Sequence, residues 1–303
     1  FFINIKRLQV TNIPEFASGY SKVNQYFHDI GTLLKVSKTS QDRTYREAVR
    51  RFDFPEVNGI NLGFSSGAHG AGFGPMLRAQ IIKDAYEIIH SGSEQPEIFH
   101  LVGLFEENVG SDRLSDMVAR IIYSDIVAYS KRIYRTLGID RESYPEYKFS
   151  DGIVINPYKN IKLLLLPVEL LHELPIARCW DDIDRVCWEN EAIRAEINDL
   201  VGNTWAKMRS AEKKQYLRNW IFMNPEWAGR IIDSYKASTV AQYDPLSDLD
   251  YLVGYLQNTF NANSDGDDDS FSAAMEIVDN YQEWTSIIKV QSTYRRKIWY
   301  NKE

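Results

Sequence analysis

The stretch Glu97-Ile-Phe-His-Leu-Val-Gly-Leu-Phe105 gives the strongest indication of the fold. It is a short, mostly apolar run that follows Pro96, and a run of this length is typical of a buried strand. An acidic turn follows it, Glu106-Glu-Asn-Val-Gly-Ser-Asp-Arg-Leu-Ser-Asp116. After the turn, apolar residues recur at helical spacing as far as Gly138, which predicts a helix from Ser111 to Leu137.

Toward the N-terminus the pattern is mainly helical. The first residues predict a short entry strand, and apolar residues at helical spacing predict a helix over Ser21 to Leu34. A short basic helix over Thr44 to Phe52 comes next, and a glycine-rich loop over residues 57–75 then leads into another helix with an apolar stripe.

Toward the C-terminus, Tyr144 to Gly152 has the composition of a linker, and Ile153 to Leu166 predicts a hairpin with its turn at Asn156-Pro157. From Asp181 onward the pattern is mostly helical. We therefore expect an α+β fold, with a small mixed sheet and helices in the N-terminal half and a mainly helical C-terminal half. The expected domains are residues 1–145 and residues 146–303, a hairpin followed by a helical region.

The composition excludes several classes of protein. The formal net charge is −7, which is unusual for a protein that binds nucleic acid over its whole surface, although a local basic patch remains compatible with it. The two cysteines provide no disulfide framework, as expected of a cytoplasmic protein. No apolar run approaches the roughly 18 residues of a membrane span, so no membrane association is predicted.

The acidic turn is the first candidate site. Asp112 and Asp116 share one helix face, and together with Glu106 they could hold Mg²⁺ or Mn²⁺ through carboxylate oxygens. A metal ion held there would activate water for phosphodiester cleavage. The alternative is that Asp112 interacts with the helix dipole, Asp116 pairs with a nearby arginine, and the glutamates face solvent.

The glycine-rich loop is the second candidate. Gly67, His69, Gly70, Gly72 and Gly74 precede a predicted helix, so their backbone N–H groups could bind phosphate, as in a nucleotide. The spacing does not match the P-loop or the dinucleotide fingerprint, and a plain surface loop is the alternative.

The third candidate is the basic, aromatic end of the chain. Arg295, Arg296 and Lys297 lie beside Tyr294 and Trp299, a combination that suits contact with nucleic acid. The alternative interpretation is an ordinary helix that continues past the last residue.

Two blocks, Phe105 to Asp116 and Leu164 to Asp182, resemble bacterial proteins of the restriction and anti-phage defence type. In those proteins a long N-terminal region of this kind precedes a PD-(D/E)xK nuclease domain. The resemblance implies that the nuclease motif lies beyond Glu303, and it assigns no catalytic residue to this sequence.

Three functions are therefore considered. The first is a recognition, regulatory or assembly portion of a defence-type nuclease protein, with nucleic acid, a partner domain or further copies of the chain as partners. The second is a metal-dependent phosphodiesterase or nuclease that uses the acidic turn. The third is an oligomerising scaffold without a ligand.

Overall fold

The computed structural model describes part of the chain, and every structural statement below concerns that part. The described residues are 2–60, 73–90, 92, 95–106, 109, 111–172, 215, 218–219, 225–237, 239–240 and 242. The chain divides into two compact units, Phe1–Gln242 and Tyr243–Glu303, and all described residues belong to the first.

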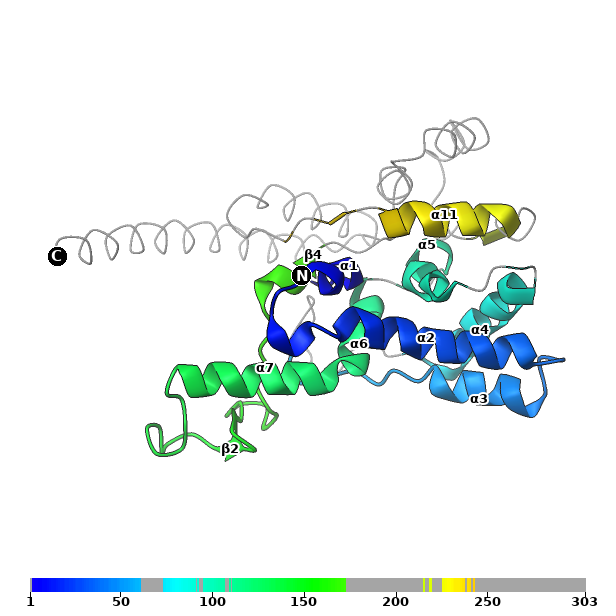
Figure 1. The fold of residues 1–303 in the computed structure, drawn as a ribbon. Helices are drawn as coiled ribbons and strands as arrows, with labels where there is room; N and C mark the ends of the chain where they lie inside the picture. Colours follow the sequence, from blue (N-terminus) through cyan, green and yellow to red (C-terminus); the bar gives the residue numbers. More distant parts are fainter. Residues whose placement is uncertain are drawn as a thin grey trace, which may run out of the picture. The chain divides into compact units, whose positions relative to one another are not determined.

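The fold is α+β and consists mostly of helices, as the sequence predicts (Figure 1). Two small antiparallel sheets are present, and the first of them pairs β1 (Phe2–Ile3) with β4 (Leu171–His172). The helices of the described part are α1 (Ile5–Val10), η1 (Pro14–Phe16), α2 (Gly19–Val36), α3 (Arg43–Arg51), α4 (Pro75–His90), η2 (Pro96–Leu101), α5 (Val102–Phe105), α6 (Ser111–Ile121), α7 (Tyr123–Thr136), η3 (Val168–Leu170) and α11 (Pro225–Ala237).

The stretch Glu97 to Phe105 is helical, so the predicted strand is wrong. Residues 96–101 form the 3-10 helix η2, which continues into α5. A run of apolar residues has no period that separates a buried strand from a buried helix. Pro96 at the first position favours a helical turn, and the residues from Ile98 to Val102 are buried whichever way they point.

The helix predicted over Ser111 to Leu137 is present as two shorter helices. α6 ends at Ile121, and α7 begins at Tyr123 after the non-helical backbone of Ile122 (φ −96, ψ 19). Gly138 has a positive φ of 64°, which lets it end the helix at the predicted place.

The core lies where α2 packs against α3, α4 and η2. Phe27 of α2 stacks on Phe99 of η2, with ring centroids 5.0 Å apart and an interplanar angle of 14°. Phe52 and Phe54 pack beside them at tilted angles and lie edge to face with each other. The helical spacing in Ser21 to Leu34 predicted α2 correctly, because Val23, Phe27, Ile30 and Leu34 are all fully buried.

A hairpin is present over the predicted residues and continues into an additional strand. Val154 accepts a hydrogen bond from Leu163 N–H at 2.9 Å, and Ile155 forms a bridge with Lys162. The additional strand β2 (Phe149–Ser150) pairs with β3 (Ile153–Val154). Residues on both sides of position 145 therefore lie in one compact unit.

No helix of the described residues is long and apolar enough to cross a membrane.

Candidate functional site

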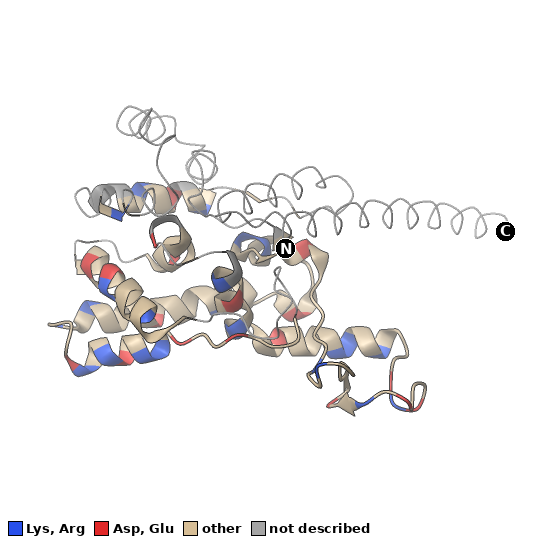
Figure 2. Cartoon of the chain, turned by 180° about the vertical axis from the view of Figure 1, so that it is seen from behind, with Lys and Arg blue, Asp and Glu red and all other residues tan. Residues whose placement is uncertain are grey.

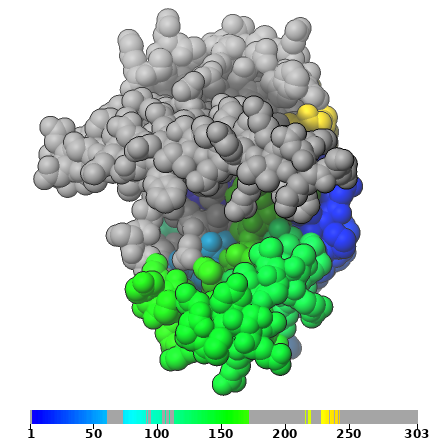
Figure 3. Space-filling model, turned by 90° about the vertical axis from the view of Figure 1, so that its left-hand side faces the viewer, coloured from blue at the N-terminus to red at the C-terminus, as the bar shows by residue number. Residues whose placement is uncertain are grey.

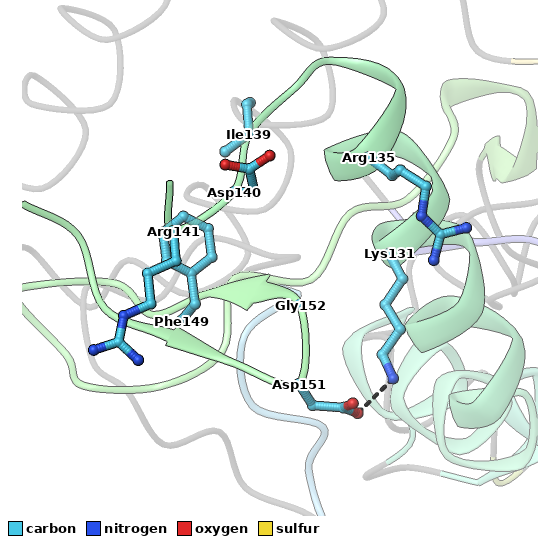
Figure 4. A pocket seen from close by; sticks show the side chains of 8 residues that line it. All are labelled: Lys131, Arg135, Ile139, Asp140, Arg141, Phe149, Asp151 and Gly152. Atoms are coloured by element: carbon cyan, nitrogen blue, oxygen red, sulfur yellow. Dashed lines mark hydrogen bonds and ion pairs between the residues drawn. The ribbon is translucent and has the colours of Figure 1, made fainter. Parts of the chain in front are cut away.

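An open pocket of about 580 Å³ lies at the end of α7 (Figure 4). Its walls come from the last turns of α7, from the turn that follows, and from the β2–β3 hairpin. The lining residues are Lys131, Arg135, Ile139, Asp140, Arg141, Phe149, Asp151 and Gly152. A volume of this size is within the range of roughly 300–1,000 Å³ that small-ligand sites have.

Two local turns shape the pocket. After Gly138 the carboxylate of Asp140 accepts hydrogen bonds from the N–H groups of Glu142 (3.0 Å) and Ser143 (2.8 Å), which fixes the chain in a tight turn. Asp151 and Gly152 both have positive φ, 55° and 74°, as the two-residue turn of a β-hairpin requires. The two turns bring the hairpin close to the end of α7.

The pocket is rich in cations. Lys131 and Arg135 are one helical turn apart on the same face of α7, and Figure 4 shows them on successive turns, with Lys131 directed to Asp151. Arg141 lies on the other side of the pocket (Figure 4). The three positive groups therefore border one cavity, although they come from two separate elements.

Both acids of the pocket already have partners. Asp151 accepts a hydrogen bond from Lys131 Nζ at 2.5 Å, and this contact lowers the pKa of the Asp151 carboxyl. Hydrogen bonds from Ser143, chiefly from its backbone N–H, likewise lower the pKa of Asp140. Among the side chains that the structure describes, neither Arg135 nor Arg141 has an ion-pair partner. Two guanidinium groups are thus available for an anion.

The surrounding chain, residues 131–162, is called the basic segment. It contains seven Lys and Arg residues against four Asp and Glu, a net charge of +3 in a chain whose net charge is −7. Figure 2 shows Lys and Arg on the last turns of α7 and in the neighbouring hairpin, and Figure 3 shows this green region on one face of the molecule. The basic segment is therefore positively charged in a chain that is negatively charged overall.

Three tyrosines of the basic segment are exposed. The exposed fractions are 41% for Tyr144, 45% for Tyr147 and 94% for Tyr158. Tyr158 is in a second tight turn, in which the Asn156 side chain accepts hydrogen bonds from the N–H groups of Tyr158 and Lys159. Cations and exposed rings together are typical of surfaces that bind nucleic acid strands.

This site was not among the predicted ones. The stretch Tyr144 to Gly152 was predicted to be a linker. The available signal was the clustering of cationic and aromatic side chains in one short stretch: Arg141, Tyr144, Tyr147, Lys148 and Phe149. Flexible segments usually contain few aromatic residues.

The acids of the predicted metal site lie between helices and not at the end of a strand. Glu106 follows α5 and is only 5% exposed, with Arg218 Nε 3.9 Å from its Oε1. Asp112 and Asp116 both belong to α6, but the side chain of Asp112 is outside the described part. The described side chains include no group of three or more His, Cys, Asp or Glu that could hold a metal ion. The site for Mg²⁺ or Mn²⁺ stays a prediction.

The other two predicted sites fall almost wholly outside the described residues. Gly67, His69, Gly70 and Gly72 are outside them, as are Arg295, Arg296 and Lys297. Gly74 is described, and it is exposed just before α4, with open space where a side chain would be. Phosphate binding by the loop also stays a prediction.

An ion pair between a buried carboxylate and a partly exposed arginine links distant parts of the chain. Asp84 of α4 is fully buried, and Arg218 donates to its two carboxylate oxygens at 2.6 and 2.5 Å. The hydrogen bonds that Arg218 donates to Asp84 raise the pKa of Arg218. Lys6 donates from Nζ to the carbonyl of Lys236, at the end of α11. These contacts attach Arg218 and α11 to the helices of the N-terminal region.

Residues 1–178 match a family described as a domain of unknown function, DUF8370. The chain belongs to this family. The DUF8370 region contains the basic segment and the acidic turn, whereas Arg218 and α11 come after its end. Searches of curated proteins and of solved structures gave no match.

Proposed function

We propose that this chain is the recognition portion of a bacterial anti-phage defence or restriction-type nuclease protein, and that it binds nucleic acid at the pocket of the basic segment. The catalytic nuclease domain would be outside this chain. The proposed location is the cytoplasm, and the proposed partners are nucleic acid, a nuclease domain and further copies of the chain. A single observation carries the proposal: Arg135 and Arg141 border one pocket with no ion-pair partner among the described side chains.

The physical basis is the affinity of guanidinium for phosphate. Arginine presents a planar fork of donors that fits two phosphate oxygens at once. Each phosphate that is neutralised also releases condensed counterions, so affinity falls as salt rises, with a slope of about −0.7 per contact on a single strand. The acidic charge of the rest of the chain would confine a polyanion to the basic segment.

Reversing the two free charges tests the proposal. We expect Arg135→Glu/Arg141→Glu to weaken the binding of labelled DNA or RNA by roughly 10- to 100-fold and to reduce the salt slope by about 1 to 2. Fluorescence anisotropy over a series of KCl concentrations measures both quantities.

The matched control reverses two positive charges at another place on the surface. Arg43 and Arg46 are exposed on α3, and neither has an ion-pair partner in the part of the chain that the structure describes. Arg43→Glu/Arg46→Glu should leave affinity close to that of the unchanged protein. Equal losses in the two double variants would mean that binding follows overall charge and not the pocket, and would overturn the proposal.

A recognition portion should bind without turnover. With Mg²⁺ or Mn²⁺ present we expect no cleavage of duplex or single-stranded DNA or RNA, either by this chain or by its Asp112→Ala/Asp116→Ala variant. Denaturing gels measure the products. Cleavage that disappears in the variant would make the acidic turn an active site and would contradict a purely recognising role.

A further inference from the structure

We propose that the pocket of the basic segment takes a single-stranded polynucleotide, with phosphates at Arg135 and Arg141 and unpaired bases against Tyr144 and Tyr147. This inference rests on the proposed function and names the form of nucleic acid that the site selects. It comes from the rings of the basic segment, whereas the proposed function comes from its charges.

The exposed rings are concentrated in one region. Of the large apolar side chains that are exposed in the described part, every tyrosine is in the basic segment, and Leu137 is there as well. By contrast, Tyr26 and Tyr45 lie against Phe54 and Tyr86 in the packed region of α2, α3 and α4. An exposed ring keeps apolar area in water, which favours a partner that covers it.

Backbone hydrogen bonds fix the turn that carries these rings before any ligand binds. Tyr144 N–H donates to the carbonyl of Asp140 at 3.0 Å, and Tyr147 N–H donates to the carbonyl of Tyr144 at 3.2 Å. The Asp140 carboxylate caps the same turn through Glu142 and Ser143. A ring on a fixed turn has only two torsions left to order, so stacking on it costs little conformational entropy.

The pocket adds an apolar wall beside the cations. Phe149 and Ile139 line it, and both are partly exposed. Arg141 and Phe149 line the cavity, and Tyr144 and Tyr147 lie between them along the chain, so the exposed rings are close in sequence to the cations. A nucleic acid strand carries phosphates and bases side by side and would contact both kinds of side chain.

This arrangement distinguishes single strands from duplexes. In a duplex the faces of the bases are covered by their neighbours, so a ring can stack only at an end or on an extruded base. In a single strand every base has a free face, and stacking on an aromatic side chain is insensitive to sequence. A duplex would therefore meet only the cations, and a single strand would meet the cations and the rings.

The experiment compares one sequence in several forms. Labelled DNA and RNA single strands of roughly 10 nucleotides, and the matching duplexes, are titrated with the full chain and followed by anisotropy. We expect tighter binding of the single strands. The DNA and RNA arms show whether the 2′-hydroxyl contributes.

Two double variants separate the contribution of the rings to binding from that of the cations. Tyr144→Leu/Tyr147→Leu should weaken single-strand binding roughly 10- to 100-fold and leave duplex binding nearly unchanged, whereas Tyr144→Phe/Tyr147→Phe should restore it. Unchanged melting temperatures confirm that both variants are folded.

The possible outcomes separate this inference from the proposed function. Equal binding of single strands and duplexes, or full binding by the leucine variant, overturns the single-strand inference. If Arg135→Glu/Arg141→Glu still weakens binding in that case, the proposed function stands. If no form of nucleic acid binds, both are overturned.

Discussion

Replacing Arg218 by methionine should lower the free energy of unfolding by roughly 3 kcal/mol, because it leaves the carboxylate of Asp84 buried without its charge partner. Asp84 is fully buried, and Arg218 donates to both of its oxygens. Removing one member of a buried pair costs far more than the pair contributes, since the remaining charge keeps its desolvation penalty. Chemical denaturation of Arg218→Met and of the unchanged chain gives the difference.

Two controls make this result specific to the buried pair. Asp84→Leu/Arg218→Met removes both charges and should be more stable than Arg218→Met alone, as a double-mutant cycle would show. Arg50→Met breaks an exposed pair with Glu47 on α3 and should change stability little. If Arg218→Met behaved like Arg50→Met, Asp84 would not depend on Arg218.

The second large effect is a loss of stability in acid that originates at His100. This ring is 1% exposed, lies against the rings of Tyr20, Phe27 and Tyr235, and has no hydrogen-bond partner for either nitrogen in the described part. Burial lowers the pKa of His100 to about 3, and the nearby charge of Lys6 contributes further. The neutral ring is therefore the form that fits the folded chain.

The sign of the effect follows from where the proton binds. Below the ordinary histidine pKa of about 6.5 the unfolded chain takes up a proton that folded His100 does not bind until about pH 3. Folding stability therefore falls as the pH decreases from about 6.5 to 3, by roughly 2 kcal/mol at pH 5 and by up to about 4 to 5 kcal/mol at pH 3.

Unfolding free energies at pH 7 and pH 5 test this expectation. His100→Phe places a ring that does not titrate among its aromatic neighbours, and it should remove about 2 kcal/mol of the difference between the two pH values. His28→Gln, on the exposed side of α2, is the control for the loss of a histidine. An unaltered pH dependence in His100→Phe would assign the acid sensitivity to other groups.

The sequence predicted the helices because the spacing of apolar residues and the stop residues depend only on positions a few residues apart. In α2 the buried residues recur every three or four positions, and at Gly138 a residue that tolerates positive φ ends α7. Glu97 to Phe105 has no such period, and its helical form depends on being enclosed by α2 and α11. The mistaken strand therefore reflects tertiary packing that the sequence alone does not display.

The candidate site was predictable only in part. The charges and tyrosines of the basic segment are evident in the sequence. The pocket itself forms because the Asp140 turn and the Asp151-Gly152 turn bring the hairpin to α7. The pairing of Asp84 with Arg218 spans 134 positions and has no local signal beyond an acid in the apolar stripe of α4. A contact of this kind forms only in the folded chain, so a local sequence pattern does not predict it.

The pairing of β1 with β4 has a mechanical consequence. Phe2 lies opposite His172, and Ile3 lies opposite Leu171, so the open end of this short ladder is at Phe2 and His172. A pulling force between the N-terminus and the chain after His172 would load its hydrogen bonds one after another, as in a zipper. The bond from Asn4 N–H to the carbonyl of Leu170 would come next. Tension would thus open the molecule at this edge first, and α7 with its pocket would carry no load until the ladder had separated.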